Sequence, residues 1–499
     1  MKKILYLLLI LSTMASCKKE LTIEPLSTGT TETFYRTQED FIQGSNAIYN
    51  SLRSYPDRLI NLSETRSDNL YAISVLGTQL YDPINAFRTD AVSNTYVNAA
   101  WNDNYNAIYR ANIFLDQLDQ KGDVVGAALR ERLRAEARFL RAFYYFDLVR
   151  YFGKLPVVTR PVTALEAVEI PRSPVADVYK VIIEDLQYAI PILPATYPAT
   201  NIGRATKYAA ESLLAMVYMA RSGATYGIEG PGMGLNEYNL ALPLLNDVIN
   251  SGQFALGTTY AGIFSYATQN PGVNREAIFD VMHTSGLNPV LGASFVSLPV
   301  PDAYFTSVLV KPAQLGGSGR PTSYDLYNSY EDADTRKSFS YILYFTQLGI
   351  PGNRPFLKKY LDVTKVPAVI TDWGINFMAI RYTDVLMLKA ECILRGAPGA
   401  QSDVDLIYNQ VRTRSGASTA SNVTLAQLYA ERRREFSGEG SRWFDLQRSG
   451  NLVTTMNQWI AANDDLKQIQ PVIANWIIYP IPQAQLDAKP GLYSQNPGY

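Results

Sequence analysis

The sequence has very few of the residues that usually hold metals or form disulfides, with one histidine and two cysteines among 499 residues. A zinc site or a disulfide framework needs more ligands or more cysteines than this. An excess of charge is also lacking, because the formal net charge is −1. Nucleic acids are bound through many basic side chains. We therefore expect no nucleic-acid partner, no metal and no cofactor.

Motifs of the common enzyme classes are absent too. We find no phosphate-binding loop and no dinucleotide fingerprint, and the run GGSGR at 316–320 lacks the final glycine of a nucleophile elbow. His283 has no second base or ligand motif beside it, and Cys392 lies in an apolar helical pattern, so both are interpreted as structural. A glycosidase needs only two carboxylates, and the 46 acidic residues leave that class open.

The apolar run at residues 4–11 is much shorter than the roughly 20 residues of a membrane-spanning helix. Lys2 and Lys3 precede this run, and the small-residue stretch 12–16 follows it. That order is typical of a secretory signal peptide. We therefore predict a signal peptide over 1–16 and no transmembrane helix.

Cys17 follows those small residues directly, as the lipidated cysteine of a bacterial lipoprotein does, although Met14 matches the lipobox imperfectly. The polar, unpatterned residues 17–30 then have the composition of a flexible tether. Acyl chains on Cys17 would anchor the protein to a membrane. The alternative is an ordinary secreted protein in which Cys17 has no such role.

Helical periodicity is what the chain has in abundance. The clearest helix is predicted over 129–151, where Leu133 and Leu140 share one face while Phe139 and Phe143 lie on a second. A helix that is apolar on two sides must lie between neighbours, as in a stack of helical hairpins. Similar patterns predict helices over 41–52, 100–118, 174–190, 206–221, 381–395 and 404–414.

Three of these helices carry an Ala-Glu pair with a leucine soon after, as degenerate tetratricopeptide helices do, although no clean repeat period is present. Between residues 223 and 376 the helical pattern largely lapses, and Gly, Pro, Ser, Asn and Tyr increase. The expected fold is mainly α, built of degenerate tetratricopeptide-like helical pairs, with a loop-rich insertion that carries little regular strand. The expected regions are 31–225 (N-terminal helices), 226–375 (loop-rich insertion) and 376–499 (C-terminal helices and closing segment).

A charged stretch at 431–448 mixes five arginines with four acids and three aromatic residues. Its small net charge is too little for binding phosphates, and buried guanidinium and carboxylate groups must be paired. We interpret it as a structural ion network that joins the last helices to the rest of the fold. Gly438 and Gly440 are expected to let the backbone turn between two helices, the second beginning near Ser441.

Four separated motifs resemble the SusD/RagB outer-membrane lipoproteins, in the family's order and over the whole chain. They are the run AEARFLRAFYYFDLVRYFG at 135–153 with Leu155-Pro156, the stretch 431–448, the run YPIP at 479–482 and the tail QNPGY at 495–499. The resemblance implies an all-helical scaffold of tetratricopeptide-like pairs with a loop-rich second half. It also implies lipid-anchored display on the outer membrane and a TonB-dependent SusC-like transporter as partner, to which nutrient, usually glycan, is delivered. These motifs mark the scaffold and do not name the ligand.

A neutral glycan is bound by aromatic rings that lie against the sugar faces and by polar groups that satisfy the hydroxyls. Two stretches, one from Arg66 to Trp101 and the other from Tyr304 to Asn376, hold such mixtures of residues, mostly outside the clearest helices. Each residue also fits the simpler role of loop packing or turn chemistry, and Trp101 falls on a helical pattern that suits the core. The predicted ligand-binding residues are Arg66, Asp68, Asn69, Tyr71, Tyr81, Asn85, Arg88, Trp101, Tyr304, Tyr327 and Trp373.

The leading hypothesis is a non-enzymatic lipoprotein that faces the cell exterior, captures an oligosaccharide and hands it to the transporter. Peptide capture, as in the RagB branch of the family, is the alternative among binding proteins. A lipid-anchored glycoside hydrolase and a purely scaffolding tetratricopeptide protein are alternatives from other classes. Binding of peptides alone would exclude glycan capture, and new reducing ends in a bound glycan would indicate the hydrolase.

Overall fold

The computed structural model describes residues 34–72, 78–270, 272–309, 319–343, 346–347, 350–351 and 354–499. The predicted signal peptide, Cys17 and the tether lie outside these residues. Within them the fold is mainly α-helical, with only short strands, as the sequence predicts. None of the described helices has the length and apolar character that a membrane-spanning helix needs.

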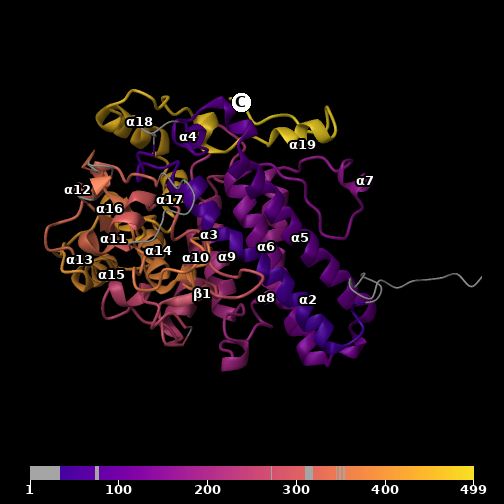
Figure 1. The fold of residues 1–499 in the computed structure, drawn as a ribbon. Helices are drawn as coiled ribbons and strands as arrows, with labels where there is room; N and C mark the ends of the chain where they lie inside the picture. Colours follow the sequence, from indigo (N-terminus) through magenta and orange to yellow (C-terminus); the bar gives the residue numbers. More distant parts are fainter. Residues whose placement is uncertain are drawn as a thin grey trace, which may run out of the picture.

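The N-terminal half is a stack of long helices, drawn from indigo to magenta in Figure 1. These helices are α2 (Gln38–Asn50), α5 (Thr95–Lys121), α6 (Ala127–Phe152), α8 (Val175–Ala189), α9 (Lys207–Arg221) and α10 (Tyr238–Asn250). Helix α6 packs against both α5 and α8, and α9 packs against α8 and α10. Because Phe139, Leu140 and Phe143 are all buried, the prediction that this helix is apolar on two sides is confirmed.

The C-terminal helices are shorter and follow one another closely. They are α14 (Tyr382–Leu394), α15 (Gln401–Arg414), α16 (Leu425–Glu435), α17 (Arg442–Ser449), α18 (Leu452–Asn463) and α19 (Gln483–Ala488). Helix α14 packs against α15 on one side and against α10 on another, so it joins the two halves of the fold. Figure 1 shows α18 and α19 in yellow across the top of the molecule.

Short elements lie within and between these two groups of helices. The strands pair antiparallel as β1 (Ala277–Val281) with β6 (Phe377–Arg381), β2 (Tyr341–Ile342) with β5 (Phe356–Leu357), and β3 (Thr346–Gln347) with β4 (Ile350–Pro351). The short helices are α3 (Tyr55–Arg58), α4 (Asp82–Asn85), α7 (Ala164–Ala167), α11 (Asp302–Leu309), α12 (Tyr324–Asn328) and α13 (Thr335–Ser340). The described residues also form one π-helical segment, η2 (Leu59–Glu64). Their six short 3₁₀ segments are η1 (Ser51–Ser54), η3 (Thr89–Ser93), η4 (Gly122–Val124), η5 (Ala199–Asn201), η6 (Ala261–Phe264) and η7 (Ala474–Ile477).

One continuous core connects the helical half with the segment predicted to be irregular. Phe279 of β1 packs edge-on against Phe139 of α6, with ring centroids 5.0 Å apart, and Phe377 of β6 contacts Tyr55. Helix α10 also lies inside the segment 226–375, which the sequence interpretation expected to be an irregular, loop-rich insertion. The loop-rich segment is therefore packed into the main core by α10 and by the β1–β6 pair.

Candidate functional site

The two stretches predicted to bind ligand meet in the structure along a line that we call the seam, formed by residues 69–72 and 319–323. Leu70 and Thr322 form an antiparallel bridge at its centre. Backbone hydrogen bonds of 2.9 Å lie on both sides of that bridge. The fold thus brings together segments that are about 250 residues apart in sequence.

Tyr71 in the seam is buried, as are Tyr81 and Asn85. The Tyr71 hydroxyl donates a hydrogen bond of 2.7 Å to the Asp464 carboxylate. The Tyr81 hydroxyl donates to the Gly319 carbonyl at 2.8 Å, and the Asn85 amide donates to two backbone carbonyls. The polar groups of these three side chains are therefore used within the protein.

Arg66, Asp68 and Asn69 are also buried. The Arg66 guanidinium lies over three aromatic rings at 4.2 to 5.4 Å from their centroids. Asp68 accepts two hydrogen bonds of 2.7 Å from Arg442, and the Asn69 oxygen accepts one of 3.0 Å from Arg433. Burial alone would raise the pKa of Asp68, but Arg433 and Arg442 lower it to about 2.

Trp101 and Trp373 lie in the core. Trp101 packs edge-on against Phe152, with ring centroids 5.2 Å apart. Trp373 is fully buried, and its indole N–H donates to the Ile370 carbonyl at 2.7 Å. Neither ring offers an exposed face for a sugar.

Three of the predicted residues do reach the surface. Arg88 is exposed and pairs with Asp90 at 2.5 Å, while Tyr304 and Tyr327 are half-buried. Tyr324, which belongs to the same predicted stretch but not to the predicted set of ligand-binding residues, is 40% exposed on the same short helix as Tyr327. Figure 1 shows α12 at the upper left, α11 below it and α4 near the top of the molecule. We call the exposed parts of Arg88, Tyr304, Tyr324 and Tyr327 the loop face.

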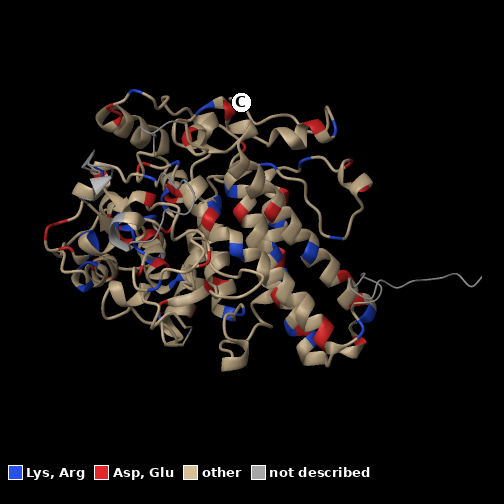
Figure 2. Ribbon diagram, in the orientation of Figure 1, with Lys and Arg blue, Asp and Glu red and all other residues tan. Residues whose placement is uncertain are grey.

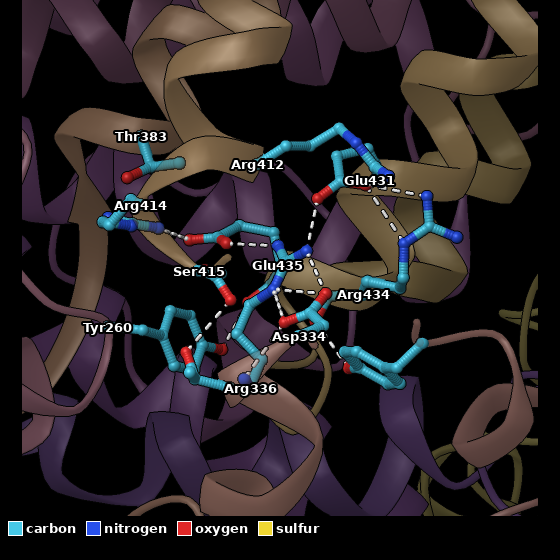
Figure 3. A network of polar contacts seen from close by, with 12 residues as sticks. Tyr260, Asp334, Arg336, Thr383, Arg412, Arg414, Ser415, Glu431, Arg434 and Glu435 are labelled. Carbon is cyan, nitrogen blue, oxygen red and sulfur yellow. Dashed lines mark hydrogen bonds and ion pairs between the residues drawn. The ribbon is translucent and has the colours of Figure 1, made fainter. Parts of the chain in front are cut away.

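The stretch 431–448 forms a buried ion network, part of which is shown in Figure 3. At its centre the fully buried Arg336 contacts Asp334 at 2.7 Å, Glu431 at 2.6 Å and Glu435 at 2.8 Å. Burial would raise the pKa of Glu435, but three neighbouring arginines, among them Arg381, hold it well below its usual value. The prediction of a structural network is thus confirmed.

The partners in this network were only partly foreseen. Arg434 pairs with Glu431 and Arg432 with Asp445 inside the stretch. Arg433 pairs with Asp325 and Arg442 with Asp68, both outside the stretch. Arg448 pairs with Glu391 outside the stretch and with Asp445 inside it, each at 2.8 Å. Each arginine of the stretch therefore has a carboxylate partner, and none is left to bind an external anion. Figure 2 shows both signs of charge interspersed over the helices in that view.

Cys392 and His283 have the surroundings of structural residues. Burial raises the pKa of the Cys392 thiol, which lies 3.8 Å from the sulfur of Met219. Burial lowers the pKa of His283 to about 4, and its ring packs against Phe295. No group of three or more His, Cys, Asp or Glu side chains that could hold a metal occurs among the residues described.

Two cavities of about 370 Å³ each lie away from the seam, beside β1. They adjoin at the lining residues Ile202, Gly203, Arg204 and Asp280, which they share, and we call the two cavities together the groove. Sequence reasoning missed this groove because its walls come from separate segments that share no motif. A third cavity, of about 330 Å³, lies beside Trp101.

Known proteins similar to this chain share both sequence and fold with it. A family model described as "Starch-binding associating with outer membrane" matches residues 36–219, and a model described as "SusD family" matches residues 351–499. SusD-like protein P25 of Formosa agariphila is 26% identical, over 99% of this chain and 99% of its own. A SusD-like protein of Bacteroides ovatus is 26% identical, over 83% of this chain and 76% of its own.

Solved structures with this fold include surface glycan-binding protein A from Bacteroides thetaiotaomicron in complex with laminarihexaose. It superposes with a TM-score of 0.77 at 23% identity, covering 92% of this chain and 99% of its own. Surface glycan-binding protein A from Bacteroides uniformis has a TM-score of 0.75 at 24% identity, with 92% and 99% of the two chains covered. Two family models, full-length relatives and a shared fold agree, and the chain belongs to the SusD/RagB family.

Proposed function

We propose that this protein is a cell-surface glycan-binding lipoprotein, which captures an oligosaccharide and hands it to a TonB-dependent SusC-like transporter in the outer membrane. The observation that carries the proposal is the likeness over nearly the whole chain to a protein solved with laminarihexaose bound. The family model over residues 36–219, described as starch-binding, supports the same ligand class. Lipidation of Cys17 provides the anchor.

Within this proposal the loop face contacts the glycan. Tyr304, Tyr324 and Tyr327 supply aromatic rings, and Arg88 supplies hydrogen-bond donors for the hydroxyls. The buried residues from the predicted set, Arg66 to Asn85 with Trp101 and Trp373, hold the frame behind that surface. Their hydrogen bonds and ring contacts within the protein favour this division of roles.

The experiment is a calorimetric titration of the full chain carrying Cys17→Ser, secreted as a soluble protein, with laminarihexaose. The double variant Tyr324→Ala/Tyr327→Ala should weaken binding about tenfold, because two sugar-stacking rings are lost. Tyr109→Ala on α5, where a ring is 48% exposed, is the matched control and should not change the affinity. Unchanged binding in the double variant would exclude the loop face as the binding surface.

The remaining parts of the proposal have separate tests. Wild-type chain should stay with outer-membrane vesicles, and Cys17→Ser should be released into the medium. An affinity-tagged chain should co-purify with an outer-membrane transporter. Incubation with the bound glycan should yield no new reducing ends, whereas their appearance would indicate the hydrolase instead.

A further inference from the structure

The groove beside β1 is built from segments that are distant in sequence. Its lining comes from the C-terminal end of α2 with η1, from the segments 195–206 and 252–254, and from the residues in and around β1. Its two cavities of about 370 Å³ each share Gly203 and Arg204 in their linings. In Figure 1, β1 lies at the lower centre of the molecule, away from the α12 and α4 region of the loop face.

Three guanidinium groups line this groove, and two of them have no ion pair with any described carboxylate. Arg53 donates to the carbonyls of Val290 at 2.7 Å and Gly292 at 3.4 Å. Arg275, which is exposed, donates to the Gly252 carbonyl at 2.7 Å. Carbonyl partners orient these side chains but leave their positive charges uncompensated.

The third guanidinium is that of Arg204, which lines both cavities. It pairs with the fully buried Glu136 at 2.7 Å, but Glu136 also contacts Arg132 at 3.2 Å. One negative charge therefore serves two positive ones. The acid that lines both cavities, Asp280, is buried, which raises its pKa to about 8, so it adds little negative charge at neutral pH.

Aromatic rings and neutral hydrogen-bonding groups make up much of the remaining lining. The Tyr49 and Tyr197 rings are held by their hydroxyls, since Tyr49 accepts from the Ala205 N–H at 3.0 Å and Tyr197 donates to Glu136 at 3.1 Å. Among the polar groups are the side chains of Asn50, Asn201, Thr206 and Gln253. Rings for sugar faces, amides and hydroxyls for sugar hydroxyls, and arginines for anions are thus combined in one groove.

We propose that this groove is a second carbohydrate site, which binds an acidic oligosaccharide through pairing of its carboxylate or sulfate groups with Arg53, Arg204 and Arg275. The inference rests on the proposed function as a glycan-binding protein and adds a second, charge-selective site to it. Arginine suits this role because its planar fork pairs with carboxylate and sulfate oxygens in a bidentate manner. An acidic peptide would match the charge, but the proposed glycan binding and the ring-and-amide lining favour the sugar.

The test uses the full chain with Cys17→Ser and three probes: hexagalacturonate, a sulfated galactan hexasaccharide and neutral laminarihexaose. At least one acidic probe should bind, and high salt should weaken that binding more than it weakens laminarihexaose binding. The two acidic probes distinguish a uronic-acid ligand from a sulfated one. Arg53→Gln/Arg275→Gln should reduce the affinity for the acidic probe at least about tenfold, with the melting temperature and laminarihexaose binding unchanged.

The variant is chosen to keep the fold intact, because among the described residues Arg53 and Arg275 donate to backbone carbonyls, whereas Arg204 pairs with a buried acid. Arg130→Gln at the start of α6, which removes one positive charge outside the groove, should leave all three affinities unchanged. If laminarihexaose binds and neither acidic probe does, or if the double variant binds the acidic probe normally, the groove proposal fails and the proposed function stands. If only acidic peptides bind, both fail.

Discussion

Asp68 and Asp280 are both buried acids, 2% and 5% exposed, with opposite surroundings. Arg442 and Arg433 hold Asp68 in its charged form and lower its pKa to about 2. Both carboxylate oxygens of Asp280 lack a hydrogen-bond partner in the described structure, and burial raises its pKa to about 8. The surroundings thus stabilise the charged form of Asp68 and the protonated form of Asp280.

Asp280→Asn should change how the stability depends on pH. Between the usual pKa of 3.8 and about 8, the folded carboxyl keeps a proton that the unfolded chain releases. The contribution of Asp280 to the unfolding free energy is therefore fully present below pH 4 and is lost as the pH rises toward 8, by up to about 1.4 kcal/mol per pH unit. Urea unfolding of wild type and variant across this range should show the variant gaining stability relative to wild type as pH rises. A pH-independent difference would contradict the protonated form.

Arg442→Ala should act on stability rather than on ligand selectivity. The change removes the two 2.7 Å bonds to Asp68 and leaves that buried acid with Arg433 at 3.3 Å. Breaking a buried pair typically costs about 3–5 kcal/mol, and Trp443→Ala should cost a similar amount by opening a cavity. Arg130→Ala, which breaks the exposed pair with Asp123, should cost less than about 1 kcal/mol. A well-folded Arg442→Ala that had lost only glycan affinity would contradict the structural role.

The turn between α16 and α17 depends on glycine at two positions. Gly438 and Gly440 both have positive φ, and their N–H groups donate to the buried Glu64 carboxylate at 2.7 and 3.1 Å. A Cβ on Gly440 would lie 2.5 Å from the Cβ of Leu59. This turn thus joins the C-terminal helices to η2 in the N-terminal half.

Gly440→Ala should destabilise the fold for two reasons, the left-handed backbone and the steric clash with Leu59. We expect a loss of more than about 2 kcal/mol in chemical unfolding. Gly491→Ala is the matched control, since Gly491 has a similar φ of 86° but open space around it. The control should lose only about 1 kcal/mol from the backbone term. Equal losses in the two variants would show that close packing at Leu59 does not matter.

The helices were predictable where apolar residues recur at helical spacing over a long segment. The pattern of 129–151 predicts α6 nearly to its ends, Ala127 and Phe152, because α6 is buried along most of its length. Helix α10 was missed, since Pro243 lies inside it and a glycine-rich run precedes it. The contacts of the seam could not be predicted from the sequence, because they are backbone hydrogen bonds between segments that are distant in the chain.

At the scale of the whole molecule, only part of the candidate site could be predicted from the sequence. Residue type pointed to two stretches that do meet, but composition does not separate a ring in the core, such as Trp373, from one at the surface, such as Tyr324. The groove at Arg53 and Arg275 could not be found at all without the fold that assembles its walls. The motifs that identify the family belong to the buried frame. They therefore do not indicate which ligand the protein binds.

One calorimetric measurement decides whether this protein captures glycans. The full chain with Cys17→Ser is titrated with laminarihexaose, maltohexaose and xylohexaose, with the acidic oligosaccharides, and in parallel with a set of extended peptides. We expect at least one oligosaccharide to bind with a dissociation constant in the micromolar to millimolar range, or about −8 to −4 kcal/mol, and no peptide to compete for it. Binding of peptides with no binding of any oligosaccharide would contradict glycan capture and assign the protein to peptide uptake.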